Sequence, residues 1–401
     1  MKKLTVTILI LMFIGIPVFS ADLIRIPYPM TMRQRGMGDA FTAVADDYYL
    51  LFTNPAGLAQ VKNMRTELDN RIVQIPLVSL GVGVQNKVVR NIQDLADALN
   101  STDTTDAEQI AGVLETLGNF NRENFGFMIE DPFLAWGIVD EHIGFNFAPF
   151  LLDVNMKPIV GLRPEMYLDI STYLQAIFGT CPLNIDLFKN SRLDIGFGFK
   201  GVGLFAFEGS AELVDFFDWS EDSSQALTWL TDNMDLGFGF GLNVGAILSL
   251  PWGLNVGLSL LDAPTLIFYP NFEGSGELKT KFAFPNVRTG VSYSLDWQDI
   301  NVNMPGWLLD NPIVAFDLTN LFDTSYKVWT KVHLGMSVNV INTKIFGLNA
   351  AAGLNKGYGT FSATARLFIV QLSYALWQDE NGIKAGDYPV WQHLFSINLR
   401  L

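Results

Sequence analysis

The chain has 401 residues and is acidic, with 41 Asp and Glu residues against 26 Lys and Arg and a net charge of −15. Such a charge repels nucleic acid, so binding to DNA or RNA is not expected. Hydrophobic residues make up 49% of the chain and charged residues only 17%, below the roughly one quarter that is usual in soluble domains. The apolar side chains therefore need either a large protein core or lipid around them.

The first 20 residues have the pattern of a secretory signal peptide. They begin with two lysines, continue with a long apolar run and end next to the small residues Ser20 and Ala21, where a signal peptidase could cut. The mature protein is therefore expected to be exported. No cysteine lies at the cut, so a lipid anchor is not expected, and the only cysteine, Cys181, cannot form a disulfide within the chain.

The next segment, residues 21–66, does not alternate like a strand and is predicted to be a folded plug. Gly36 and Gly38 give it a permissive backbone. Asn54 followed by Pro55 is typical of a helix N-cap with proline at the first helical position. A short helical turn is therefore expected after Asn54.

Three motifs in this segment carry a resemblance. Gly-Met-Gly at 36–38, Ala-Val-Ala-Asp-Asp at 43–47 and Asn-Pro-Ala-Gly-Leu at 54–58 resemble the N-terminal hatch of FadL-type long-chain fatty-acid transporters, and more closely that of their PorV, UPF0164 and TraF-like relatives. The match covers about thirty residues. The resemblance implies a barrel stoppered by a hatch, with candidate hatch and gating residues Gly36, Met37, Gly38, Asp46, Asp47, Asn54, Pro55, Ala56 and Gly57.

The rest of the chain, residues 67–401, is predicted to be the barrel, because apolar residues alternate with small or polar ones in many segments. In the segment 236–244, Leu, Phe and Val alternate with Gly and Asn, which is the two-residue period of a strand with one apolar face. Residues 236–261 carry no charge, but their six glycines and Pro251 favour a hairpin over a membrane helix. Since open sheet edges are not viable in hydrocarbon, the strands should close on themselves.

About fourteen strands are predicted, which gives an all-β membrane protein built as an antiparallel transmembrane β-barrel with an N-terminal hatch and short helical loop insertions. The predicted strands are 67–84, 121–129, 133–139, 143–156, 163–179, 190–207, 235–250, 254–268, 280–296, 312–321, 328–341, 344–355, 360–377 and 389–401, and one of the two short early segments is not necessarily separate. This assignment leaves long and short connections mixed at both ends of the barrel. In 360–377 the alternation changes phase, which predicts a bulge or kink at Phe368–Val370.

Tryptophans near predicted strand ends, at Trp252, Trp297, Trp377 and Trp391, fit the aromatic belts at membrane interfaces, although ordinary core packing is the alternative for each. The last strand ends in Leu401, where an aromatic residue is usual. Two helical insertions are predicted, at 86–120 and 209–233, from apolar helix faces and a capping box at Thr105. The first resembles an insertion of the TraF-like and UPF0164 relatives.

No enzymatic chemistry, cofactor or metal site is expected. The three histidines, His142, His333 and His393, fall in no metal-ligand spacing, and neither His-Glu-x-x-His nor Gly-x-Ser-x-Gly occurs. His333 lies on the polar phase of a predicted strand. It is therefore interpreted as a lumen or surface residue and not as a general base.

Two functions of different classes follow. The first is passive uptake of a hydrophobic molecule such as a long-chain fatty acid across the bacterial outer membrane, gated by the hatch, with Arg33 and Arg35 as candidate partners for a carboxylate. The two arginines could instead pair with Asp46 and Asp47 to hold the hatch in place. The second is a non-transporting PorV-like or TraF-like adaptor in a secretion or conjugation assembly, with protein partners at the surface or the periplasmic side. A general diffusion porin and a secreted β-sandwich are weaker alternatives.

Overall fold

The structure, a computed structural model, describes residues 23–64, 72–84, 125–130, 136–159, 165–188, 190–212, 224–225, 228–229, 234–270, 279–295, 297, 305–324, 327–380 and 389–400. The predicted signal peptide, the helical insertion at 86–120 and most of the insertion at 209–233 lie outside these residues. The second insertion begins later than predicted, because the preceding strand continues to Glu212.

The alternating segments form strands of a single large sheet. Its eighteen strands are β1 (Leu23–Ile24), β2 (Ile72–Val84), β3 (Phe125–Glu130), β4 (Trp136–Val139), β5 (Ile143–Ile159), β6 (Glu165–Phe188), β7 (Ser191–Glu212), β8 (Met234–Ser249), β9 (Leu254–Leu261), β10 (Thr265–Tyr269), β11 (Lys279–Ala283), β12 (Asn286–Ser294), β13 (Leu308–Leu318), β14 (Val332–Asn342), β15 (Phe346–Asn355), β16 (Tyr358–Leu367), β17 (Val370–Glu380) and β18 (Pro389–Arg400).

The sheet closes into a barrel. The last strand, β18, pairs with β2, and β9 pairs with both β8 and β12, so the described strands form a closed ring. β3 and β4 share the position between β2 and β5, while β9 and β10 both follow β8, and β11 and β12 lie beside them. We count β3 with β4, β9 with β10 and β11 with β12 as one position each and leave β1 out. The described strands then occupy fourteen positions in the ring, as predicted.

Two errors in the predicted strands cancel in that count. The two short early segments share one position, whereas the predicted strand 360–377 is two strands joined at Phe368 and Ile369. The predicted bulge there is wrong, because Leu367 pairs directly with Val370 and Phe368 adopts a positive φ of 52° in a tight turn. A two-residue turn shifts the alternation just as a bulge does. Phe-Ile also lacks the Gly or Asn that usually marks such turns.

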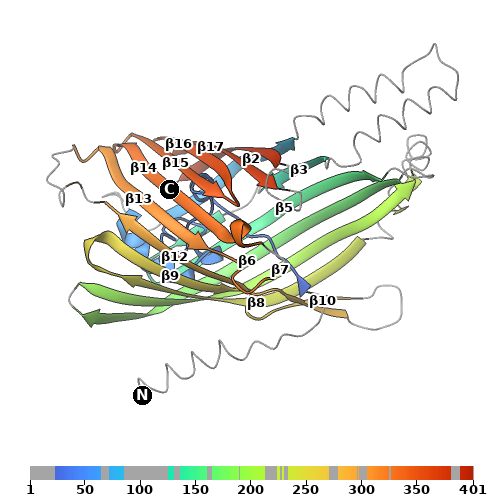
Figure 1. The fold of residues 1–401 in the computed structure, drawn as a ribbon, viewed down its shortest axis with the longest axis horizontal. Coiled ribbons are helices and arrows are strands. Elements are labelled where there is room, and N and C mark those ends of the chain that lie inside the picture. Colours follow the sequence, from blue (N-terminus) through green and yellow to red (C-terminus); the bar gives the residue numbers. More distant parts are fainter. Residues whose placement is uncertain are drawn as a thin grey trace, which may run out of the picture.

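The corrected strands sort the connections between the two ends of the barrel. One end, called here the short-turn end, carries the connections 140–142, 189–190, 250–253, 343–345 and 368–369 together with one longer connection at 295–307. The other, the long-loop end, carries the connections that include the two predicted insertions, together with one two-residue turn at 356–357. Strands β5 to β8 are longer than the others, and Figure 1 shows that they extend the wall on one side of the barrel.

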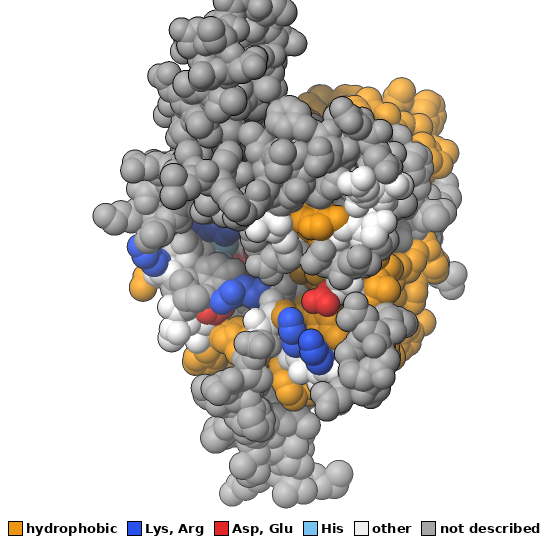
Figure 2. All heavy atoms as spheres, turned by 90° about the vertical axis from the view of Figure 1, so that its right-hand side faces the viewer, with side chains coloured by type: hydrophobic (Ala, Val, Ile, Leu, Met, Phe, Trp, Pro, Cys, Tyr) orange, Lys and Arg blue, Asp and Glu red, His pale blue; other side chains and the backbone are white. Residues whose placement is uncertain are grey.

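The outer face of the barrel is apolar, as the alternation predicts. Phe238, Phe240 and Met336 point outward with 49%, 53% and 57% of their surface exposed, whereas Asn243 and His333 point inward and are buried. In the view onto the long-loop end, hydrophobic side chains cover the flank of the barrel, and basic and acidic side chains lie nearer its middle (Figure 2). Trp377 departs from its predicted interface position, because its ring is buried inside the barrel.

No helix among the described residues is both long and apolar enough to cross a membrane.

Residues 23–64 lie inside the ring of strands and are called the plug from here on (Figure 1). The plug contains one turn of α-helix, α2 (Met32–Gly36), and two 3-10 helices, η1 (Leu50–Phe52) and η2 (Pro55–Met64). Its largest apolar cluster packs Leu51, Phe52 and Leu58 against wall residues Ile177 and Ile247, all of them buried. The hydrophobic core of the molecule therefore lies between the plug and the barrel wall.

Candidate functional site: the plug and its seat in the barrel

The first predicted hatch motif, Gly36 to Gly38, follows α2 and lies against strands β15 and β16. The side chain of Thr31 caps α2 by accepting a hydrogen bond from the Gln34 backbone N–H. Gly38 has a φ of 64°, and a Cβ there would overlap the backbone of Leu354, so only glycine fits. The carbonyl of Gly36 accepts a hydrogen bond from Thr360 Oγ1 at 2.7 Å. The permissive backbone predicted for this motif allows the plug to lie directly against the wall.

The wall supplies the matching surface with glycines of its own. Gly196, Gly245, Gly257, Gly335 and Gly353 point inward from five strands, and a Cβ on any of them would collide with plug atoms, among them the carbonyl oxygens of Pro55, Thr42 and Met37. These five inward glycines are thus the seat on which the plug backbone rests. The pattern of these glycines is visible in the sequence, but their contact with the plug is not.

The third motif, at 54–58, ties the plug to itself and to the wall. Asn54 Oδ1 accepts a hydrogen bond from the Ala56 N–H (3.1 Å), which confirms the predicted cap, although the helix that follows is a 3-10 helix. Asn54 Nδ2 donates to the carbonyl of Thr42 (2.8 Å) and, over a longer distance, to that of Ala246 on β8. Gly57 has no room for a side chain against Ala45.

The two candidate ligand-binding arginines of the plug already have partners, some in the plug and some in the wall. Arg33 forms an ion pair with Asp46 (2.7 Å) and donates to Ser337 on β14, whereas the Arg35 guanidinium lies over the ring of Trp377 at 4.5 Å. Arg33 therefore pairs with Asp46, as in the alternative in which the arginines hold the hatch in place. A ligand role for either arginine stays a prediction.

Asp47 is held by uncharged partners. Its carboxylate accepts hydrogen bonds from the Thr31 hydroxyl and from the Tyr49 N–H (3.0 Å). Burial raises the pKa of Asp47 to about 7, an effect that the Thr31 hydrogen bond reduces and the neighbouring Asp46 increases. Between the ordinary pKa of 3.8 and about pH 7, the docked plug therefore holds a proton that the free segment would lose.

The first part of the plug, residues 23–31, is an extended segment in the half of the lumen nearer the long-loop end. β1 pairs in parallel with β11, and Ile26 packs in an apolar cluster with the wall residues Val202, Leu204, Ile267, Tyr269 and Ala283. Two residues later, the Tyr28 hydroxyl donates to Asp262, which also forms an ion pair with Lys200. Lys200 and Asp262 are fully buried. The N-terminal segment of the plug thus covers an apolar cluster on the inner wall and, two residues further on, a buried cation.

Several wall residues that hold the plug were not singled out from the sequence: Lys200, Asp262, Arg288 and Asp317. His333 was predicted to face the lumen or the surface, and it is buried against the plug. The sequence does contain a signal for Arg288 and Asp317, because both are charged residues at positions where the alternation of the strand points the side chain inward. Their partners lie more than 200 residues away in the chain, so sequence spacing could not pair them.

The wall is irregular beside the plug. β2 pairs with β3 only at Gly81 and Met128, and with β4 over three residues. The register of β5 against β6 shifts between Ala148 and Leu151. The plug borders this region, because Asn146 of β5 donates to the Tyr48 carbonyl.

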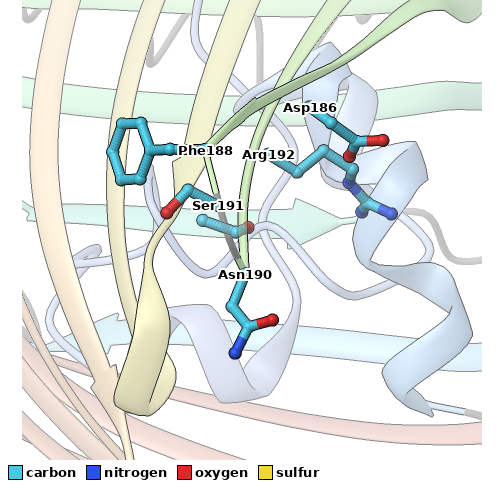
Figure 3. Close-up of a pocket in the computed structure, with 6 residues that line it drawn as sticks. Asp186, Phe188, Asn190, Ser191 and Arg192 are labelled. Carbon is cyan, nitrogen blue, oxygen red and sulfur yellow. The ribbon is translucent and has the colours of Figure 1, made fainter.

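A separate cavity of about 490 Å³ lies at the short-turn end, lined by Asp186, Phe188, Asn190, Ser191, Arg192 and Ser249 (Figure 3). Arg192 reaches from it to the carbonyl of Ala59 at 3.3 Å, so the cavity borders the end of the plug. Figure 3 shows Asp186 and Arg192 close together in this recess, which makes it polar. Within the described part of the chain, no group of three or more His, Cys, Asp and Glu residues is arranged to hold a metal ion.

Comparison with known proteins finds likenesses among solved structures only. No family model matches the chain, and no curated protein does. The CymD monoaromatic hydrocarbon channel aligns over 95% of this chain and 98% of its own length at 11% identity and a TM-score of 0.41. The P. putida toluene transporter TodX aligns over 92% and 97% at 8% identity and 0.34, and a Pseudomonas aeruginosa FadL homologue over 93% and 98% at 10% identity and 0.40. The resemblance to the PorV, UPF0164 and TraF-like groups stays a prediction.

Proposed function

We propose that this protein is an outer-membrane barrel for passive uptake of hydrophobic molecules, with the plug as its gate. The observation that carries the proposal is the apolar cluster on the inner wall, in which Ile26 of the chain's own N-terminal segment is packed. An apolar outer wall suits a barrel surrounded by lipid. A general diffusion porin would instead need an open, polar lumen, so the position of the plug supports a gated barrel over a porin.

The orientation follows from the two ends of the barrel. Outer-membrane barrels have short periplasmic turns and longer outer loops, so the short-turn end faces the periplasm and the long-loop end faces outward. A molecule that enters from outside first meets the N-terminal segment of the plug. The irregular wall beside β3 and β4 offers a way out to the side of the plug, although the lumen remains an alternative path.

The apolar cluster around Ile26 and the nearby Lys200 suggest an amphiphile such as a long-chain fatty acid. An acyl chain could replace Ile26 in contact with Val202 and Leu204, and its carboxylate would then lie next to Lys200. Asp262 already neutralises Lys200 while the plug is in place. Arg33 and Arg35 remain second candidates for the carboxylate, and Arg33 would first have to leave Asp46.

Uptake with a tethered gate tests the proposal. Ile24 and Ala283 are partners across the β1–β11 pair, so cysteines at the two positions would be close enough to form a disulfide. In a Cys181→Ser background, oxidation of the Ile24→Cys, Ala283→Cys variant should stop uptake of labelled oleate into liposomes, and reduction should restore it. Each single-cysteine variant is the control and should transport under both conditions.

The same assay separates the alternatives. If oleate uptake is no faster than with empty liposomes in every redox state, the transport proposal fails, and recovery of the protein with partner proteins would then favour the adaptor. To test the carboxylate site, Lys200→Met should be combined with Asp262→Asn, so that no unpaired charge stays buried. This pair should slow oleate uptake more than uptake of a neutral hydrocarbon of equal length.

A further inference from the structure

A cluster of charged and polar side chains joins the plug to three consecutive wall strands. Arg288 on β12, Asp317 on β13 and His333 on β14 point inward and are 1%, 0% and 2% exposed. They face plug residues 38–42, which have no regular secondary structure. Peptide groups in such a segment need partners from elsewhere when they are buried.

The wall side chains supply those partners. Arg288 Nη2 binds the carboxylate of Asp39 (2.8 Å) and its backbone carbonyl (2.9 Å). Asp317 Oδ2 accepts hydrogen bonds from the backbone N–H groups of Phe41 (2.8 Å) and Thr42 (2.7 Å). His333 Nδ1 lies 2.8 Å from the Gly38 carbonyl, which can only accept, so this nitrogen carries the proton.

Arg288 and Asp317 are close to each other but only loosely paired. Their nearest charged atoms, Nη2 and Oδ2, are 3.9 Å apart, because Nη2 is taken by Asp39 and Oδ2 by the plug N–H groups. Arg288 Nε and Asp317 Oδ1 are both buried without a hydrogen-bond partner among the described residues. A donor and an acceptor on neighbouring strands are thus left unused while the plug is in place.

Departure of the plug would change this arrangement. Arg288 would lose Asp39, and Asp317 would lose two N–H donors, so each would be free to pair with the other. Both side chains would then face the lumen, where a charge-assisted pair between them gives each a partner again. Arg288 and Asp317 can therefore each replace the partner that the other loses when the plug leaves.

We propose that Arg288 and Asp317 form a two-position latch. With the plug docked, Arg288 holds Asp39 and Asp317 holds the backbone at Phe41 and Thr42; with the plug released, Arg288 and Asp317 pair with each other across β12 and β13. Asp39 stays ionised throughout the mild pH range, because Arg288, followed by His333, outweighs the effect of burial and lowers the pKa of Asp39. The two residues position the plug and do not themselves need to touch the transported molecule.

The latch predicts opposite effects for two carboxylate variants. Asp39→Asn weakens only the docked state, so release should become more frequent. Asp317→Asn keeps an oxygen that can accept from both plug N–H groups, so the docked state loses only the charge-assisted part of these bonds. The released state loses the whole pair with Arg288, so release should become rarer. Two residues with a merely structural role would both loosen the plug when they are changed.

Cys181 gives a built-in readout of release. It is the only cysteine, is 1% exposed, and packs in the same apolar cluster as plug residues Leu58 and Ala59. A water-soluble maleimide should label it only when the plug has moved. Labelling needs no transported molecule, so its result is independent of the uptake proposal.

The experiment compares labelling rates of the full mature chain in liposomes, after heat-dependent gel mobility has shown that each barrel is folded. Asp39→Asn should label about tenfold faster than wild type or more, since a hydrogen bond to a charged group contributes about 1.5–3 kcal/mol. Asp317→Asn should label several-fold more slowly. Faster or unchanged labelling of Asp317→Asn, or unchanged labelling of Asp39→Asn, would overturn the latch. Asp317→Glu serves as a second variant: its longer side chain reaches Arg288 but fits the plug N–H groups poorly, so it should label faster.

Discussion

The seat of wall glycines makes a quantitative prediction for a single added methyl group. In Gly335→Ala, the new Cβ would lie 2.7 Å from the Cβ of Met37 and closer still to the Met37 carbonyl oxygen. Both belong to the plug, and the carbonyl oxygen is backbone that cannot turn away. Extra methylenes forced into a packed interior cost about 1–3 kcal/mol. The released plug feels no such clash, so release should become about 5- to 150-fold more frequent.

Labelling of Cys181 measures this change on the opposite side of the plug, where the substitution does not reach. When opening is faster than labelling, the labelling rate follows the population of the open form. The matched control is Gly359→Ala on β16, because a Cβ at Gly359 meets no atom within 4 Å. Equal labelling of the two folded variants would refute the claim that the inward glycines seat the plug.

Three further changes are tested by the same labelling. Asp47→Asn keeps the acceptor but cannot ionise. Since the folded pKa of Asp47 is raised to about 7 from 3.8, docking of the wild-type plug weakens as pH rises between these values and is constant above them. The wild-type labelling rate is divided by that of Asp47→Asn, because this ratio cancels the pH dependence of the thiol. The ratio should rise from pH 5 to pH 8, by up to about 100-fold if release fully solvates the carboxylate. A flat ratio would contradict the assignment. Asn54→Ala removes a cap and a donor to the plug backbone and should favour release by about 1–3 kcal/mol, so wild-type labelling would count against its role. Trp377→Leu, which removes the ring under a plug arginine, should favour release by about 0.5–2 kcal/mol, while Trp252→Leu, at a position 79% exposed, should change nothing.

The fold could be predicted well because its physical signal is local. A strand between lipid and a filled lumen must alternate apolar and small or polar residues, and Phe238, Phe240 and Asn243 lie on the faces that their positions predict. The errors occurred where the same local pattern has two structural causes. A tight turn at Phe368 and Ile369 and a bulge both shift the alternation by a residue, and only pairing of Leu367 with Val370 separates them.

The candidate site could be predicted only in part. The motifs around Gly38 and Asn54 indicated a folded plug, and both lie where the plug meets the wall. The latch could not be found in the same way, because Asp39 and Arg288 meet across about 250 residues of chain and depend on closure of the barrel. Trp377 illustrates the remaining difficulty, since its position near a strand end fits an interface belt and a buried plug contact equally well.

The claim on which the other inferences depend is that residues 23–64 close an otherwise open barrel. Conductance across planar bilayers tests it most directly. The chain without its predicted signal peptide is compared with a variant that also lacks residues 23–64 and is shown to be folded by heat-dependent gel mobility. The account predicts that the full chain stays closed for most of the time and that the shortened barrel carries a steady ionic current. Equal conductance of the two folded proteins would contradict it.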